Sequence, residues 1–71
     1  MNYIEWAKEY YNDAENLMKT IKKYEKVLKD GKDRNEEKLN KIINFYTYIY
    51  YDILNTAKML EKKGKKIESA A

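Results

Sequence analysis

The chain has 71 residues, of which 38% are charged, and its 15 basic and 12 acidic side chains give a net charge of +3. It contains no cysteine, histidine or proline, which excludes disulfides, thiolate metal sites and histidine-based catalysis. Many charges with few helix breakers are typical of a chain that is mostly long helix. Because a domain of this size buries only about 60% of its unfolded surface and is marginal alone, we expect it to self-associate.

The first predicted helix covers residues 3–30. Asn2 is a favourable N-cap, and Glu5 three residues later completes a capping box. Gly31 is expected to end the helix in the left-handed conformation, which places a turn at about residues 31–33. Between these ends the apolar residues follow an unbroken heptad pattern: Tyr3, Ala7, Tyr10, Ala14, Leu17, Ile21, Tyr24 and Leu28.

The second predicted helix covers residues 34–63 and is capped either by Asp33 with Glu36 or by Asn35 alone. Gly64 is expected to mark its end or a fraying point, with residues 64–71 as a loose tail, although residues 65–68 can extend it by another turn. Its apolar seam consists of Leu39, Ile42, Tyr46, Ile49, Ile53, Thr56 and Leu60.

The connection is so short that the two helices must lie antiparallel as neighbours. The predicted fold is therefore all-α, a single helical-hairpin domain over residues 1–71. Residues 1–18 carry a net charge of −3 and residues 58–71 a net charge of +3. Since the hairpin brings these segments together, we expect Glu5 and Glu9 to approach Lys62, Lys63 or Lys66.

The stretch 42–54 is apolar and aromatic on more than one side of its helix. Such a helix is normally buried by more than one partner, and the chain supplies only one. We therefore expect a second copy and a homodimeric four-helix bundle. In length and topology the chain resembles small hairpin proteins that dimerise in this way, although no residue motif matches. The predicted self-association interface is Trp6, Tyr11, Met18, Phe45, Tyr48, Ile49 and Ile53.

Catalysis is not expected, because a single serine and no histidine or cysteine leave no nucleophile–base pair. No cofactor or metal is expected either. Four acid and amide residues fall near the middle of the predicted bundle, and we interpret them as rim residues that meet water: Asp13, Asn16, Asp52 and Asn55. The start of the chain lacks a signal peptide and no apolar run reaches about 18 residues, which favours a cytoplasmic protein.

The preferred function is therefore a small, non-enzymatic protein–protein interaction module or regulator that acts as a homodimeric helical bundle. Its expected partners are a second copy of the chain and another protein. Nucleic-acid binding is the main alternative, because residues 19–41 hold nine basic side chains against five acids. The candidate contacts are Lys19, Lys22, Lys23, Lys26, Lys29 and Arg34. Base stacking on the eight tyrosines and a membrane-surface role for the second helix are weaker alternatives, because a matched partner helix explains the same residues.

Overall fold

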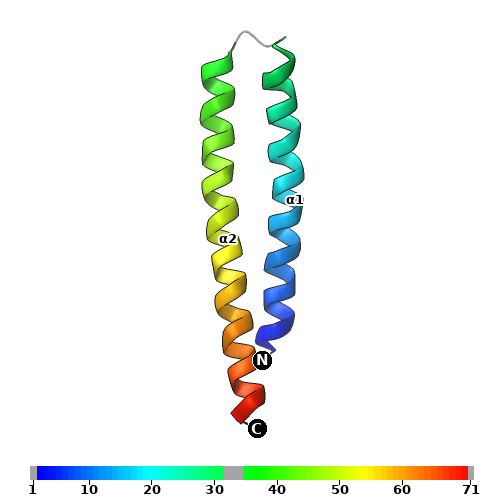
Figure 1. Ribbon diagram of the computed structural model, residues 1–71, viewed down its shortest axis with the longest axis vertical. Helices are drawn as coiled ribbons and strands as arrows, with labels where there is room; N and C mark the ends of the chain where they lie inside the picture. The colour runs from blue at the N-terminus through cyan, green and yellow to red at the C-terminus, as the bar shows by residue number, and fades with distance from the viewer. Residues whose placement is uncertain (1, 32–34, 71) are drawn as a thin grey trace.

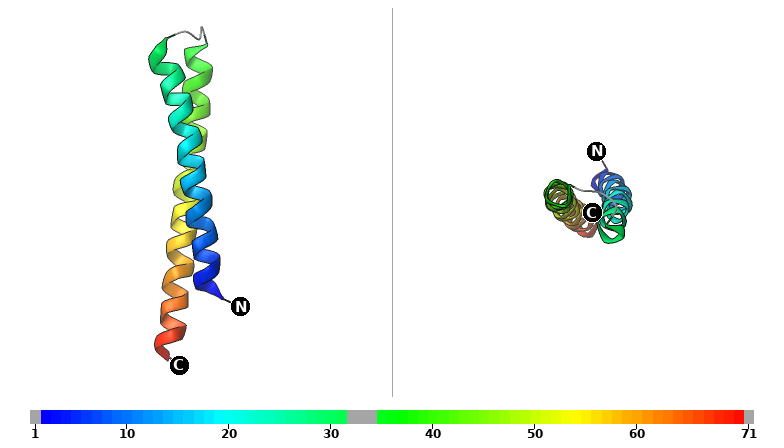
Figure 2. Two further views of the ribbon diagram at one scale, coloured as in Figure 1. Left: turned by 90° about the vertical axis from the view of Figure 1, so that its right-hand side faces the viewer. Right: turned by 90° about the horizontal axis from the view of Figure 1, so that it is seen from above.

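The protein folds as a long antiparallel hairpin of two helices, α1 (Tyr3–Asp30) and α2 (Glu36–Ala70) (Figure 1). The computed structural model describes residues 2–31 and 35–70. It measures 57 × 15 × 14 Å, with a radius of gyration of 16.4 Å, against about 11 Å for a globular domain of this length. Seen end on, each helix has one neighbour, so most of its circumference faces solvent (Figure 2). The prediction of an all-α helical hairpin is confirmed.

The ends of the helices are fixed by local hydrogen bonds. The Asn2 side-chain oxygen accepts bonds from the backbone N–H groups of Ile4 (3.1 Å) and Glu5 (3.3 Å), which confirms Asn2 as the N-cap. Gly31 adopts φ 65° and its N–H donates to the carbonyl of Leu28, as a left-handed helix cap requires. Asn35 directly precedes α2, and its carbonyl accepts from the N–H of Leu39. The competing cap Asp33 lies outside the described residues.

The prediction that the second helix ends at Gly64 is wrong. Helix α2 continues to Ala70, so residues 64–70 of the segment expected to be a loose tail are helical. Gly64 is buried instead against the start of α1. A Cβ atom at this position would lie 2.5 Å from Cδ1 and 2.7 Å from Cγ1 of Ile4. The glycine therefore serves the close approach of the two helices rather than a break in one of them.

The core between the helices is a narrow seam of mostly small side chains. Ala7, Ala14, Ile21, Leu39 and Ala57 are its fully buried apolar residues. Ala7, Ala57 and Gly64 lie in the half of the hairpin nearer the chain termini, and Ala14 lies near the middle of α1. The larger Ile21 and Leu39 lie toward the turn. The ring centroids of Tyr24 and Tyr46 are 5.9 Å apart. Together with the Ile4–Gly64 contact, this pair shows which residues of α1 and α2 lie at the same height, that is, at the same position along the long axis of the hairpin. Their residue numbers add to about 68–70.

The isolated hairpin leaves an unusually large area exposed. It presents 5940 Å² to solvent, whereas a globular protein of 8.6 kDa presents about 4,700 Å². Its unfolded chain would expose about 12,500 Å², so folding to a single hairpin buries only about half of that surface. The seam between α1 and α2 accounts for too little of the apolar area that the sequence carries.

Candidate protein-interaction surface

One side of the hairpin gathers most of its exposed apolar side chains. Trp6 and Tyr10 of α1 line a shallow depression with Thr56 and Leu60 of α2, and a second depression surrounds Phe45. Residues seven apart in a helix share a face, which extends this side from Trp6 to Val27 and from Phe45 to Met59. We call this surface the Phe45 face. Its apolar members are Trp6, Tyr10, Leu17, Tyr24, Val27, Ile42, Phe45, Ile49, Met59 and Leu60.

Two threonines make the Phe45 face more apolar than its sequence suggests. The hydroxyl of Thr56 donates to the carbonyl of Asp52 (2.9 Å), and that of Thr20 donates to the carbonyl of Asn16 (3.4 Å). Because both hydroxyls bond within their own helix, each side chain offers its methyl group to a partner.

The edges of the Phe45 face carry charges of opposite sign on the two helices. Glu9 and Asp13 border it on α1 near the termini, and Lys38 and Lys41 border it on α2 near the turn. On α2 the seven-residue spacing continues from Lys41 to Lys62, near the termini. The long sides of the face are therefore acidic at one end of α1 and basic at both ends of α2.

The predicted pairing of Glu5 and Glu9 with the lysines of α2 is not found. Both ion pairs in the described part of the chain lie within α2, between Lys41 and Glu37 (3.7 Å) and between Lys65 and Glu61 (2.9 Å). The acidic start of α1 and the basic end of α2 are close in height. Within the described residues no ion pair nevertheless joins them.

The opposite side of the hairpin is more polar. Tyr11 and Met18 line a depression there with Tyr50 and Leu54 of α2, and its border includes Glu15, Lys19 and Lys22. Beside Tyr11, hydrogen bonds from Lys65 and then from Tyr11 lower the pKa of Glu61. The same carboxylate raises the pKa of Lys65. Desolvation, followed by the contact with Glu61, raises the pKa of the Tyr11 hydroxyl.

The structure does not bring the seven residues of the predicted interface onto one face. Trp6 and Tyr11 are five positions apart, which is about 140° around a helix, and they line depressions on different sides. Tyr48 is 73% exposed at the edge of the Phe45 face. The members are distributed as follows: Trp6, Phe45 and Ile49 on the Phe45 face, Tyr11 and Met18 on the polar side, and Ile53 half-buried along the seam.

Seven apolar residues of the Phe45 face were left out of the predicted interface: Tyr10, Leu17, Tyr24, Val27, Ile42, Met59 and Leu60. Val27 follows Trp6 by 21 residues and Met59 follows Phe45 by 14. These multiples of seven are the signal in the sequence that places them together.

The predicted lysine contacts occupy the outer surface of α1. Lys19, Lys22, Lys26 and Lys29 are all exposed, and their spacing of three and four places them in one row. Lys23 is also exposed, but it projects toward the edge of the Phe45 face. Arg34 lies outside the described residues. The lysine row and the Phe45 face are therefore separate surfaces.

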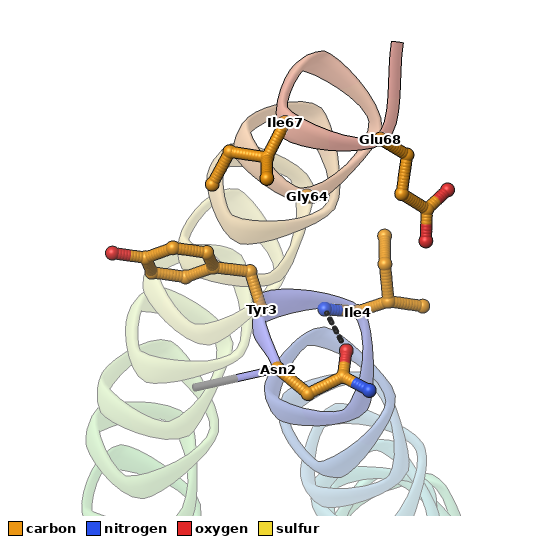
Figure 3. Close-up of a pocket in the computed structure, with 6 residues that line it drawn as sticks. All are labelled: Asn2, Tyr3, Ile4, Gly64, Ile67 and Glu68. Atoms are coloured by element: carbon orange, nitrogen blue, oxygen red, sulfur yellow. Dashed lines mark hydrogen bonds between the residues drawn. The ribbon is translucent and has the colours of Figure 1, made fainter. Parts of the chain in front are cut away.

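A further depression lies where the two chain ends meet (Figure 3). Tyr3 and Ile67 point to one side of it, and Ile4 and Glu68 point to the other. The Asn2 side chain is engaged in capping α1. Glu68 is the one carboxylate in the lining.

Within residues 2–31 and 35–70, no group of three or more acidic side chains is placed to bind a metal. Neither described helix has a stretch long and apolar enough to cross a membrane. No protein-family model, curated protein or solved structure matches the chain. Among the described residues, the Phe45 face holds most of the exposed large apolar side chains.

Proposed function

We propose that the protein is a small, non-enzymatic protein–protein interaction module or regulator that works as a homodimer, with a second copy covering the Phe45 face. The observation that carries this proposal is the position of the large apolar side chains. Phe45 is 61% exposed and Trp6 is 40% exposed, and both lie on the same side as exposed Tyr10, Val27 and Met59. Contiguous apolar patches of this kind mark association sites in soluble proteins.

The area agrees with a dimer. The hairpin exposes about 1,200 Å² more than a globular protein of its mass. A standard protein–protein interface buries about 800 Å² on each partner. Covering the Phe45 face would therefore bring the exposed area of each chain close to the value expected for its size. A two-helix layer that pairs with another in this way forms a four-helix bundle.

The mass in solution tests this proposal directly. Light scattering on a sizing column, at low and at high salt, should give a dimer under both conditions, because apolar contacts are not screened. Phe45→Asp should dissociate the dimer. Tyr51→Asp is the matched control, because Tyr51 is also an exposed aromatic residue of α2 (56%) but lies off the Phe45 face. A monomeric wild-type protein, or equal effects of the two variants, would contradict the proposal.

Nucleic-acid binding is a second candidate, and the lysine row on the outer surface of α1 supports it. A dimer that joins Phe45 faces would leave both rows open to solvent. Binding of this kind should weaken steeply with added salt. It should also be lost in the double variant Lys22→Glu/Lys26→Glu while the dimer mass is unchanged. Binding that is insensitive to salt and to these substitutions would exclude the lysine row.

A further inference from the structure

We infer that two copies of the chain join their Phe45 faces with both turns at the same end of the bundle. In this arrangement α1 of each copy lies beside α2 of the other. The inference rests on the proposed homodimer and adds its orientation. Two-fold symmetry permits one competing arrangement, with the turns at opposite ends, in which α1 packs on α1 and α2 packs on α2.

The orientation follows from the two strips of side chains that edge the Phe45 face. Each strip repeats every seven residues and would border the contact with the second copy. The strip on α1 is Glu9, Asn16, Lys23 and Asp30, and the strip on α2 is Lys41, Tyr48, Asn55 and Lys62. All eight are exposed in the single hairpin, and none belongs to an ion pair across the two helices.

With the turns at the same end, the α1 strip of one copy meets the α2 strip of the other in complementary order. Along the bundle axis, Glu9 lies within one helical turn of Lys62 of the second copy. Asp30 likewise lies within one helical turn of Lys41 of the second copy. Between them Lys23 approaches the ring of Tyr48, and the two amides Asn16 and Asn55 meet. The height offset is the same for all four pairs. Side chains lean toward the N-terminus of their own helix, so those of antiparallel neighbours lean toward each other across such an offset.

With the turns at opposite ends, the α2 strips of the two copies would meet each other. The apolar part of the face extends from Trp6 to Val27, so we place the two-fold axis midway between these residues. This axis brings Lys41 to the height of Lys62 of the second copy. It also brings Lys38 level with Lys66. Like charges directly opposite are unfavourable. The α1 strips would meet as well, and they would bring Glu9 close in height to Lys23 of the second copy. This is one favourable contact against two unfavourable ones on α2, so the sum of the charges favours the turns at the same end.

The inference also explains why Glu9 and Lys62 are not paired within the hairpin. Each projects from the outer edge of the Phe45 face on its own helix, where a second copy would place the opposite charge. Rim pairs of this kind select orientation more than they add affinity. The apolar side chains supply the association and the strips supply its direction.

Distances between spin labels separate the two arrangements. Because the chain has no cysteine, Lys29→Cys adds one label site near the turn, on α1 and away from the Phe45 face. From helix diameters and the rise per residue, two such labels should lie about 30 Å apart with the turns at the same end and more than about 40 Å apart otherwise. A long distance within a dimer would overturn the orientation alone. A monomer, with no distance between labels, would overturn the proposed function.

Charge reversal gives an independent test because the two arrangements predict opposite signs. Lys62→Glu should raise the dimer Kd about ten-fold if Lys62 faces Glu9, and Glu9→Lys/Lys62→Glu should restore it to within about three-fold. With the turns at opposite ends, Lys62→Glu would relieve repulsion by Lys41 and tighten the dimer. Glu15→Lys is the control, because it lies on the polar side of α1 and makes the same change in net charge as Glu9→Lys. It should leave the dimer Kd nearly unchanged. A tighter Lys62→Glu dimer would overturn the inference.

Discussion

Replacing Gly64 by alanine tests whether the two helices approach as closely as the structure shows. At an exposed position inside a helix, replacing glycine by alanine raises the free energy of unfolding by about 1 kcal/mol, because glycine is the poorer helix former. At Gly64 the new Cβ would lie 2.5 Å from Cδ1 of Ile4 and 3.3 Å from its backbone nitrogen. The side chain of Ile4 must then leave its packed position or the helices must separate.

The two effects can be weighed against each other. Overpacking a close contact costs about 1–3 kcal/mol, which equals or exceeds the gain in helix propensity. We therefore expect Gly64→Ala to lower the free energy of unfolding by about 0–2 kcal/mol. Ile4→Ala removes the two closest contacts and leaves only the 3.3 Å approach to the backbone nitrogen, so in that background Gly64→Ala should stabilise the protein by up to about 1 kcal/mol. The change of sign is the signature of the contact.

Denaturation followed by far-ultraviolet circular dichroism measures this cycle, at one protein concentration because association contributes to stability. Gly31→Ala is the matched control. It is strained by its φ of 65°, with no atom within 4 Å of the new Cβ, so Ile4→Ala should not relieve its cost of about 1–2 kcal/mol. If Gly64→Ala stabilises the wild-type protein by the full helix-propensity gain, the close approach at Ile4 is wrong.

Three further predictions concern other parts of the molecule. Ile21→Ala should lower the free energy of unfolding by about 2–5 kcal/mol, because Ile21 is 1% exposed. Val27→Ala should mainly raise the dimer Kd. Thermal unfolding measures the first effect and sedimentation the second. Glu61 has a lowered pKa because Lys65 and Tyr11 hydrogen-bond to its carboxylate. The ionised carboxylate therefore stabilises the folded protein at pH values above its ordinary pKa, and this stabilisation is lost as the pH falls through the lowered pKa. The loss of stability between pH 7 and pH 3 should therefore be smaller in Glu61→Gln. Asp52 lies seven residues after Phe45 and therefore on the Phe45 face, and Asp13 borders this face at nearly the same height. A dimer would gather these like charges, so Asp13→Asn should lower the dimer Kd measured by sedimentation.

The course of the chain could be predicted because its signals are local. Asn2 and Gly31 fix the ends of α1 through hydrogen bonds and backbone conformation within a few residues, and the seven-residue repeats mark the seams. Gly64 could not be interpreted in this way. A glycine near a helix end and a glycine at a helix crossing look alike in sequence. Only the position of Ile4, sixty residues earlier, distinguishes them.

The candidate interface was predicted only in part for a related reason. The sequence shows that α2 has more apolar residues than one partner can cover, and Phe45 and Ile49 do lie on the exposed apolar face. The sequence does not show on which side of the seam the additional apolar residues of α1 lie. Tyr11 and Trp6 are both aromatic and both flank the seam. The relative rotation of the two helices, set by Ala7, Ala14, Ala57 and Gly64, places Tyr11 beside Glu61 and leaves Trp6 on the Phe45 face.

The division of side chains by size links the fold to the proposed function. The seam inside the hairpin uses mostly small residues, while tryptophan, phenylalanine and several tyrosines remain outside. Because buried area determines hydrophobic stabilisation, the contribution of these large exposed side chains is available only through contacts with another molecule. Folding and association should then be one equilibrium, and the melting temperature of the wild-type protein should rise with its concentration. A melting temperature independent of concentration would mean that the seam alone holds the hairpin together and that the Phe45 face is open to a different partner.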